Sequence, residues 1–266
     1  MMQQAIDFKE ESDALRTLLE PLPDADFRQP TQFKGWTIDD VVGHLHMWNW
    51  AADTSLKDAD GFQAFYADVA RELEAGGTLR SFETRWLQGL SGRALFDTWA
   101  AYYPDMAARF AEADPKARVK WAGPDMSVRS SITARLMETW AHGQEVYDSL
   151  GVERADSDRI RNIAHLGMNT FGWTFMVRGL EIPADIPYVR LTAPSGDVWE
   201  WNAPQAENKV EGSATEFCQV VTQVRNIADT QLQVTGETAT RWMAMAQCFA
   251  GPPETPPAPG TRFRRM

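Results

Sequence analysis

The chain contains four histidines, and three of them stand in segments that suit metal binding. His142 follows Glu138 by four residues in LMETWAHGQEVY, so on a helix both side chains lie on one face and can reach one ion. A third ligand is needed, and the segment GWTIDDVVGHLHMWNW offers His44 and His46. The spacing leaves two interpretations open. Glu138 and His142 are either a solvated surface pair or two of the ligands of a metal site.

Helical phase does not decide between these interpretations. At ~100° per residue, the segment around residues 38–56 places His44 and His46 on opposite edges of its apolar stripe, with Trp48 on the edge of His44. In the later helix His142 lies just beyond the apolar stripe, and Glu138 lies nearer to the polar side. Both interpretations therefore stay open at this point.

Composition narrows the class of protein. Hydrophobic residues make up 44% of the 266 residues and charged residues 24%, which is enough to bury a core. The formal net charge of −11, without a basic stripe, argues against a nucleic-acid partner. The first residues lack the pattern of a signal peptide, and no apolar run approaches the ~18 residues of a membrane span, so we expect neither. The sequence carries no signal for an oligomeric state.

The two cysteines indicate a compartment. Cys218 and Cys248 stand in separate apolar helical patterns, which predicts buried, inert thiols and neither a disulfide nor a cysteine-based metal site. A reducing cytoplasm is the simplest location for such a chain.

The periodicity predicts two domains and a tail. Residues 1–155 are predicted to form a helical domain with helices over 6–19, 37–56, 61–77, 91–114 and 127–150. Thr37 is the predicted N-cap of the second helix, and Pro104 predicts a kink or break in the fourth. Residues 156–252 read as an α+β domain with a helix over 160–180, a hairpin over 187–202 and two strand-helix units. The first of these units contains a predicted capping box from Ser213 to Glu216. Residues 253–266 form a Pro-rich tail, which we expect to be extended or mobile.

The segments GWTIDDVVGHLHMWNW and RLMETWAHGQEVYDSLG resemble the two signature segments of the DinB-like metalloenzyme superfamily, in the branch related to mycothiol-dependent maleylpyruvate isomerase. The resemblance implies a mostly α fold, with an antiparallel four-helix bundle followed by a small, sterol-carrier-like α+β domain. It also implies that His44, Glu138 and His142 are the three ligands of a divalent ion. His46 and His165 have no counterpart in the motif, and we interpret His165 as an ordinary hinge or core histidine.

Two histidines and one carboxylate leave positions open on an ion, which is typical of a catalytic site and not of a structural one. Zinc is the first candidate, and Fe, Ni or Mn suit the same ligands. The motifs contain no cysteine, so a low-molecular-weight thiol is the natural nucleophile, as the resemblance also implies. Catalysis would run through the ion, and we assign no side chain as a catalytic acid, base or nucleophile. Arg135 and Trp48 are candidates for binding the substrate, although Arg135 also suits a solvated helix face.

Three classes of function remain, each with a small-molecule partner. The first is a metal-dependent thiol transferase or isomerase acting on an electrophile. The second is a metal-dependent hydrolase or lyase that activates water, for example against an acyl thioester. The third is a non-catalytic carrier, in which the second domain binds an acyl or sterol-like molecule.

Overall fold

The computed structural model describes residues 1–265, which form two compact units, Met1–Ser149 and a second unit that begins at Leu150. The boundary lies a few residues before the one predicted at residue 155. In residues 1–265 no helix is both long enough and apolar enough to cross a membrane.

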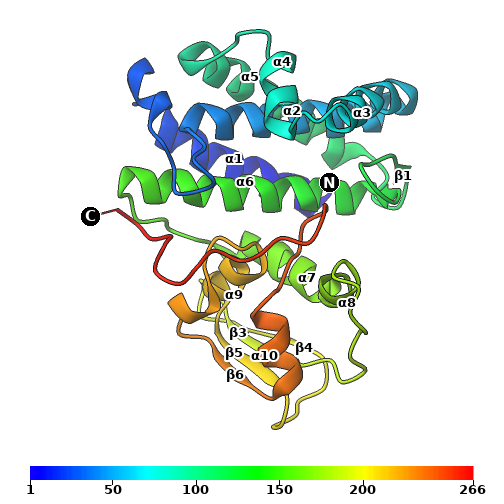
Figure 1. The fold of residues 1–266 in the computed structure, drawn as a ribbon, viewed down its shortest axis with the longest axis vertical. Coiled ribbons are helices and arrows are strands. Elements are labelled where there is room, and N and C mark those ends of the chain that lie inside the picture. The colour runs from blue at the N-terminus through cyan, green and yellow to red at the C-terminus, as the bar shows by residue number, and fades with distance from the viewer. Residues whose placement is uncertain (266) are drawn as a thin grey trace. The chain divides into compact units, whose positions relative to one another are not determined.

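Four long helices build the first unit (Figure 1). They are α1 (Gln3–Leu19), α2 (Ile38–Lys57), α5 (Gly92–Glu112) and α6 (Val128–Leu150). Between them lie the 3-10 turn η1 (Asp24–Arg28), the shorter helices α3 (Ala59–Glu74) and α4 (Leu79–Trp86), and the two-stranded ribbon β1 (Arg118–Val119) and β2 (Met126–Ser127). The mostly helical class is as predicted. Helix α4 was not predicted, and α5 continues through Pro104 without a break.

The contacts between helix ends give their directions. The N–H of Met2, at the start of α1, donates to the carbonyl of Ala111 near the end of α5, so these helices are antiparallel. The N–H of Gly92 donates to Asp39, where α5 and α2 both begin, so these two helices are parallel. A parallel pair needs a long connection, and α3 and α4 lie within it.

Helix α2 begins at the predicted cap. The Thr37 hydroxyl accepts a hydrogen bond from the N–H of Asp40, and the Asp40 carboxylate accepts one from the N–H of Thr37. Arg80, at the start of α4, also donates to Asp40. This reciprocal cap satisfies two N–H groups that the first turn leaves free, and it fixes the start of the helix that carries His44.

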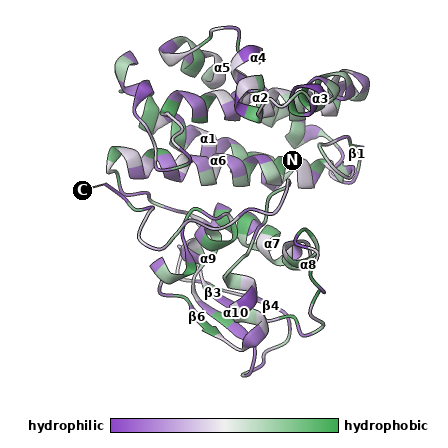
Figure 2. Ribbon diagram, in the orientation of Figure 1, coloured by the Kyte–Doolittle hydropathy of each residue, from purple (hydrophilic) through white to green (hydrophobic). Residues whose placement is uncertain are grey.

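The long helices bury one face each. Figure 2 shows hydrophobic and hydrophilic residues alternating along their ribbons, the pattern of helices that pack on one side. The buried side chains include Phe8, Leu15, Leu45, Trp99, Tyr103 and Trp140. A further aromatic cluster joins α2 to α3 and α4 through Trp48, Phe62, Phe65 and Phe82, with Trp121 packed against it. This cluster holds the crossover helices against α2.

The second unit is an α+β unit, as predicted. After η2 (Asp158–Ile160) come α7 (Arg161–Asn169), α8 (Phe171–Met176), β3 (Tyr188–Thr192), β4 (Val198–Trp201), β5 (Lys209–Ser213), α9 (Ala214–Val221), η3 (Ile227–Asp229), β6 (Gln233–Thr235) and α10 (Glu237–Met243). The sheet has the order β4-β3-β5-β6, and β3 and β5 are its parallel pair. The predicted hairpin is confirmed in β3 and β4. The helix predicted over 160–180 is broken at Thr170 into α7 and α8.

Aromatic side chains form the core of the second unit: Trp242 of α10 is fully buried against Phe171 and Phe217. The start of α9 differs from the prediction. The predicted capping box is wrong, because Ser213 makes no side-chain cap and Glu216 instead accepts from the N–H of Gln231. Ser213 ends strand β5, and its backbone is paired with β3.

The tail and the cysteines both belong to the fold of this unit. Residues 253–258 have no regular secondary structure, a turn follows at residues 259–260, and the segment is hydrogen bonded to this unit: Asn226 donates to the carbonyl of Pro257, and the N–H of Gly260 donates to Asp229. Cys218 and Cys248 are buried thiols, as predicted.

Candidate metal centre

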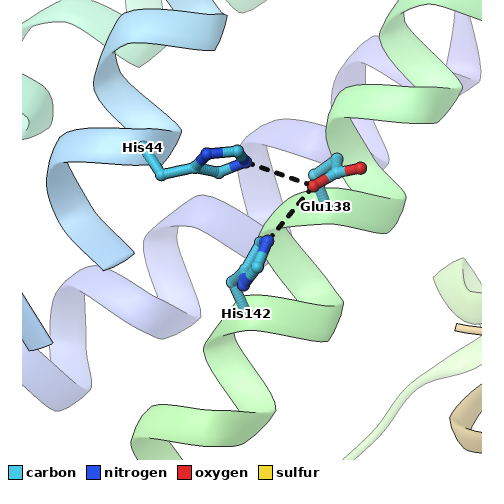
Figure 3. Close-up of side chains that lie close together, drawn as sticks. All are labelled: His44, Glu138 and His142. Atoms are coloured by element: carbon cyan, nitrogen blue, oxygen red, sulfur yellow. Dashed lines mark hydrogen bonds and ion pairs between the residues drawn. The ribbon is translucent and has the colours of Figure 1, made fainter. Parts of the chain in front are cut away.

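Three side chains from α2 and α6 converge in the first unit (Figure 3). The Nε2 atoms of His44 and His142 lie 3.4 Å and 3.3 Å from the same oxygen, Oε2 of Glu138. The convergence has a simple origin. Glu138 and His142 are one turn apart on α6, and His44 faces them from α2. Arg135, which precedes Glu138 on α6, donates a hydrogen bond to Asn49, which follows His44 on α2. The two helices therefore run antiparallel.

The spacing of these atoms fits a small divalent ion. All three ligand atoms lie within 4.8 Å of one another. Ligands ~2.0–2.2 Å from a tetrahedral ion are separated by ~3.3–3.6 Å, and the distances to Glu138 fall in this range. The donor set of two imidazoles and one carboxylate is one that zinc and non-haem iron accept. The residues present therefore fit a divalent metal.

A fourth residue, Glu83 of α4, holds His44 from behind. The Nδ1 atom of His44 lies 2.8 Å from Oε1 of Glu83, and the indole N–H of Trp48 donates to the same oxygen at 3.2 Å. With its proton on Nδ1, the His44 ring directs the lone pair of Nε2 toward Glu138. This is the tautomer that a metal ligand needs.

His142 is positioned by aromatic rings. Trp36 stacks on it with a centroid distance of 5.4 Å and an interplanar angle of 6°, and Phe33 meets it edge-on at 5.1 Å. Both rings come from the tight turn Phe33–Lys34–Gly35–Trp36, closed by a hydrogen bond from the Trp36 N–H to the Phe33 carbonyl. Lys34 and Gly35 both have positive φ, 48° and 72°, as a type I′ turn requires.

The electrostatics of the centre favour a cation. Burial alone would raise the pKa of Glu138, but hydrogen bonds from His142 and His44 hold it well below its usual value. Burial would lower the pKa of His44, but Glu83 and Glu138 raise it to about 9. Burial lowers the pKa of His142, against the hydrogen bond to Glu138. At neutral pH the three groups by themselves are therefore an ionised Glu138 between a protonated His44 and a neutral His142, and a cation bound at Nε2 of His44 would displace the proton of that atom.

The other two histidines lie elsewhere. The ring of His46 meets Trp86 and Tyr102, and burial lowers its pKa to about 4, so it is neutral at physiological pH. His165 lies on α7 in the second unit, where it is exposed and accepts a hydrogen bond from the Trp201 indole. We interpreted His165 as a hinge or core histidine, and the core alternative is wrong, because its position on α7 faces solvent.

Arg135 is buried beneath the centre. Its side chain is only 2% exposed, and its Nε donates to Oδ1 of Asn49 at 3.0 Å. Burial lowers its pKa to about 10, against the attraction of Glu138 and Glu83, so the guanidinium stays charged at neutral pH. The alternative of an arginine on a solvated helix face is therefore wrong. Trp48 is also buried, at 8% exposed.

The comparison with known proteins supplies the family. Residues 8–147 match the family described as the mycothiol maleylpyruvate isomerase N-terminal domain, more than half of the chain. The chain belongs to this family. The match confirms the resemblance of the two histidine-bearing segments, both of which lie inside or overlap the matched residues.

Relatives of this mycothiol maleylpyruvate isomerase family member include an uncharacterized protein in two strains of Mycobacterium tuberculosis. It is 39% identical over 247 residues, which is 93% of this chain and 95% of the relative. Two crystal structures of the mycothiol-dependent maleylpyruvate isomerase, one of a histidine-to-alanine mutant, align with a TM-score of 0.52 at 14% and 16% identity. They cover 82% of this chain and 87% of the solved chains, and they show that the fold is shared.

Sequence reasoning missed the residues that support the ligands in this family member. Glu83 is 39 positions from His44 and lies on the unpredicted helix α4. The sequence did carry a signal for the start of helix α4, because Thr78 and Ser81 form a capping box there. The pair Lys34-Gly35 was likewise readable as a turn, although nothing in it predicts that Trp36 stacks on His142.

Proposed function

We propose that this protein is a divalent-metal-dependent enzyme that uses a low-molecular-weight thiol to isomerise a small electrophilic substrate, or to transfer the thiol to it. The observation that carries the proposal is the convergence of His44, Glu138 and His142 on one point between α2 and α6. Family membership supports the thiol and the isomerisation, because the relatives of known structure are named as mycothiol-dependent maleylpyruvate isomerase.

The ligand count supports a catalytic centre. Structural zinc sites are closed by four protein ligands, whereas catalytic sites keep a position for a small molecule. Three ligands are offered here, so one or more positions would face the substrate. A zinc ion bound there supplies Lewis acidity, which lowers the pKa of a neighbouring thiol or water. Iron, nickel and manganese are the other candidates.

The charges around the centre support an anionic partner. His44 and His142 would bind an ion as neutral imidazoles, and Glu138 is the one ligand with a negative charge. Arg135 and Glu83 add one charge of each sign nearby. An ion of charge +2 would leave the group as a whole positive, which favours a thiolate or a substrate carboxylate.

The thiol would come from outside the chain. Both cysteines lie buried in the second unit, and burial raises the pKa of Cys218 well above its usual value, so it is a poor nucleophile. Two cysteines buried as thiols also fit a reducing compartment, and we propose the cytoplasm. An external thiolate would add to one carbon of a polarised carbon–carbon double bond. The carbon–carbon bond, now single, would rotate, and the thiolate would leave as the double bond re-forms. Nothing is consumed in this sequence, and the net reaction is isomerisation.

Arg135 and Trp48 are our candidates for binding the substrate. Trp48 has its indole N–H committed to Glu83, so it would offer a ring face and not a hydrogen bond. Arg135 carries an Nη2 atom that, within residues 1–265, has no hydrogen-bond partner. A carboxylate of the substrate or of the thiol would satisfy this donor, once a small movement of the buried side chain exposes it.

Metal content and metal-dependent turnover test the proposal. The purified protein is stripped with a chelator, reloaded with zinc, and assayed with a low-molecular-weight thiol and maleylpyruvate as the first substrate. We expect about one ion per chain in the wild type, and neither metal nor turnover in His44→Ala. His46→Ala is the matched control, because His46 is equally buried but faces Trp86 and Tyr102. Full activity in metal-free protein would refute the proposal.

A further inference from the structure

Glu83 is a buried carboxylate on a helix that other contacts already hold in place. It is 5% exposed, and an ionised carboxylate at that depth is strongly unfavourable unless donors compensate for its lost hydration. Arg85 and Ser81 bind α4 to Glu72 of α3, while Phe82 packs in the aromatic cluster. The attachment of α4 therefore does not depend on Glu83, and the buried charge calls for another explanation.

The partners of Glu83 point to that explanation. A single oxygen, Oε1, accepts from two donors of α2 that are one turn apart, Nδ1 of His44 and Nε1 of Trp48. The His44 contact is the shorter of the two, 2.8 Å against 3.2 Å. A carboxylate at Nδ1 keeps the proton on that atom, fixes the plane of the ring and makes Nε2 a stronger donor to a metal.

The geometry on the other side of the ring is consistent with this arrangement. Nε2 of His44 is 3.4 Å from Oε2 of Glu138. Because Nδ1 is committed to Glu83, Nε2 is the ring atom that faces the other two candidate ligands, and a bound ion would take the place of the proton that Nε2 shares with Glu138. Glu83 thus prepares His44 for an ion, whereas Trp36 and Phe33 hold the ring of His142.

We propose that Glu83 is a positioning residue for the metal centre, which acts through His44 by fixing its tautomer and orientation and so raises the affinity of the centre for its ion. The proposal rests on the proposed function, because it presupposes a metal bound by His44, Glu138 and His142.

The first test compares the zinc affinity of Glu83→Gln with that of the wild type, by competition with a chromophoric chelator. Glutamine keeps the shape of the side chain and an acceptor oxygen but removes the charge. We expect zinc affinity to fall by ~10–100-fold, the usual effect of changing a residue that orients a ligand. The matched control is Glu72→Gln, which removes a carboxylate that binds the other side of α4. We expect wild-type affinity in this control. Equal affinities in Glu83→Gln and the wild type, or an equal loss in both variants, would overturn the proposal.

A second measurement separates positioning from folding. With cobalt in place of zinc at saturating concentration, Glu83→Gln should show altered d–d absorption, because the His44 ring is less firmly held. Glu72→Gln should show the wild-type spectrum. A purely structural role would lower the free energy of unfolding of the metal-free variant and leave the cobalt spectrum unchanged, and that result would overturn the proposal.

A third measurement does not need a variant that folds. Long-range ¹H–¹⁵N NMR of the zinc-loaded wild type should show His44 protonated on Nδ1 and bound through Nε2. A His44 bound through Nδ1, or protonated on Nε2, would refute the role of Glu83. A wild type that holds no zinc refutes the proposed function itself, whereas a wild type that holds zinc and is indifferent to Glu83 refutes this inference alone.

Discussion

Replacing Glu138 with glutamine removes the negative charge at the point where the two imidazoles meet. Oε2 of Glu138 lies 3.4 Å from Nε2 of His44 and 3.3 Å from Nε2 of His142, so it is the common neighbour of both candidate ligands. Glutamine preserves the length of the side chain and one acceptor oxygen. The substitution therefore tests the charge with little change in packing.

The magnitude follows from the position of Glu138 among the ligands. Changing a residue that only orients a ligand costs ~10–100-fold in metal affinity, so loss of the one charged ligand should cost at least ~100-fold. That factor corresponds to ~2.7 kcal/mol of binding free energy. Free zinc at ~1,000 times the wild-type Kd stabilises the wild type by ~4.1 kcal/mol, and the variant, at ~10 times its own Kd, by ~1.4 kcal/mol.

The assay is denaturant unfolding of both proteins at one buffered concentration of free zinc and again without metal. We expect the zinc-dependent gain in the free energy of unfolding to be smaller by ~2.7 kcal/mol in Glu138→Gln than in the wild type. Activity with a thiol should fall together with the bound metal. An equal gain from zinc in both proteins would show that Glu138 is not a ligand, and His44, Glu138 and His142 would then not form the metal centre.

The remaining predictions concern the second histidine, the buried arginine and a separate ionic network. His142→Ala should abolish both metal binding and turnover, measured by metal analysis and activity, because two ligands hold an ion too weakly; retained zinc at wild-type affinity would contradict this. Arg135→Met should keep the metal and raise the apparent KM for a carboxylate-bearing substrate; a fall in kcat at constant KM would show that the guanidinium acts through its charge and not by contact. Asp53 is fully buried and accepts hydrogen bonds from Arg109, Lys57 and Tyr102, so although burial would raise its pKa, these donors lower it. Asp53→Asn should lower the free energy of unfolding at pH 7 by ~2 kcal/mol, a figure reduced from that of a fully buried pair because Arg109 and Lys57 are partly exposed. Since the folded pKa is below the unfolded value, this difference should be complete above ~pH 4 and disappear as the pH falls through the folded pKa; unfolding curves that differ equally at pH 7 and pH 2 would contradict it.

Many elements of both units follow from local sequence. The cap at Thr37, the apolar periods of α1, α2, α5 and α6, and the hairpin of β3 and β4 depend on neighbouring residues, and each was readable. Local reasoning failed where a distant partner decided the outcome. The pattern predicts a capping box between Ser213 and Glu216, but the Glu216 carboxylate instead accepts a hydrogen bond from the N–H of Gln231.

The candidate site shows the same division. One turn of helix brings Glu138 and His142 together, which the spacing predicts. Helical phase alone did not select His44 over His46, and family resemblance did. The structure supplies the physical reason, since the two rings leave α2 in different directions, toward Glu83 and toward Tyr102. The contact between Glu83 and His44 could not be predicted, because no local sequence pattern shows that a carboxylate on α4 meets a ring on α2.

Dependence on an external thiol distinguishes the proposed thiol-dependent enzyme from a metal-dependent hydrolase or lyase. The zinc-loaded protein is assayed with maleylpyruvate in strictly thiol-free buffer and then with a low-molecular-weight thiol, mycothiol first, added in increasing amounts. We expect no turnover without thiol, and turnover that rises and saturates as thiol is added. Turnover at full rate in thiol-free buffer would contradict it, and would show that the centre activates water as a hydrolase or lyase does.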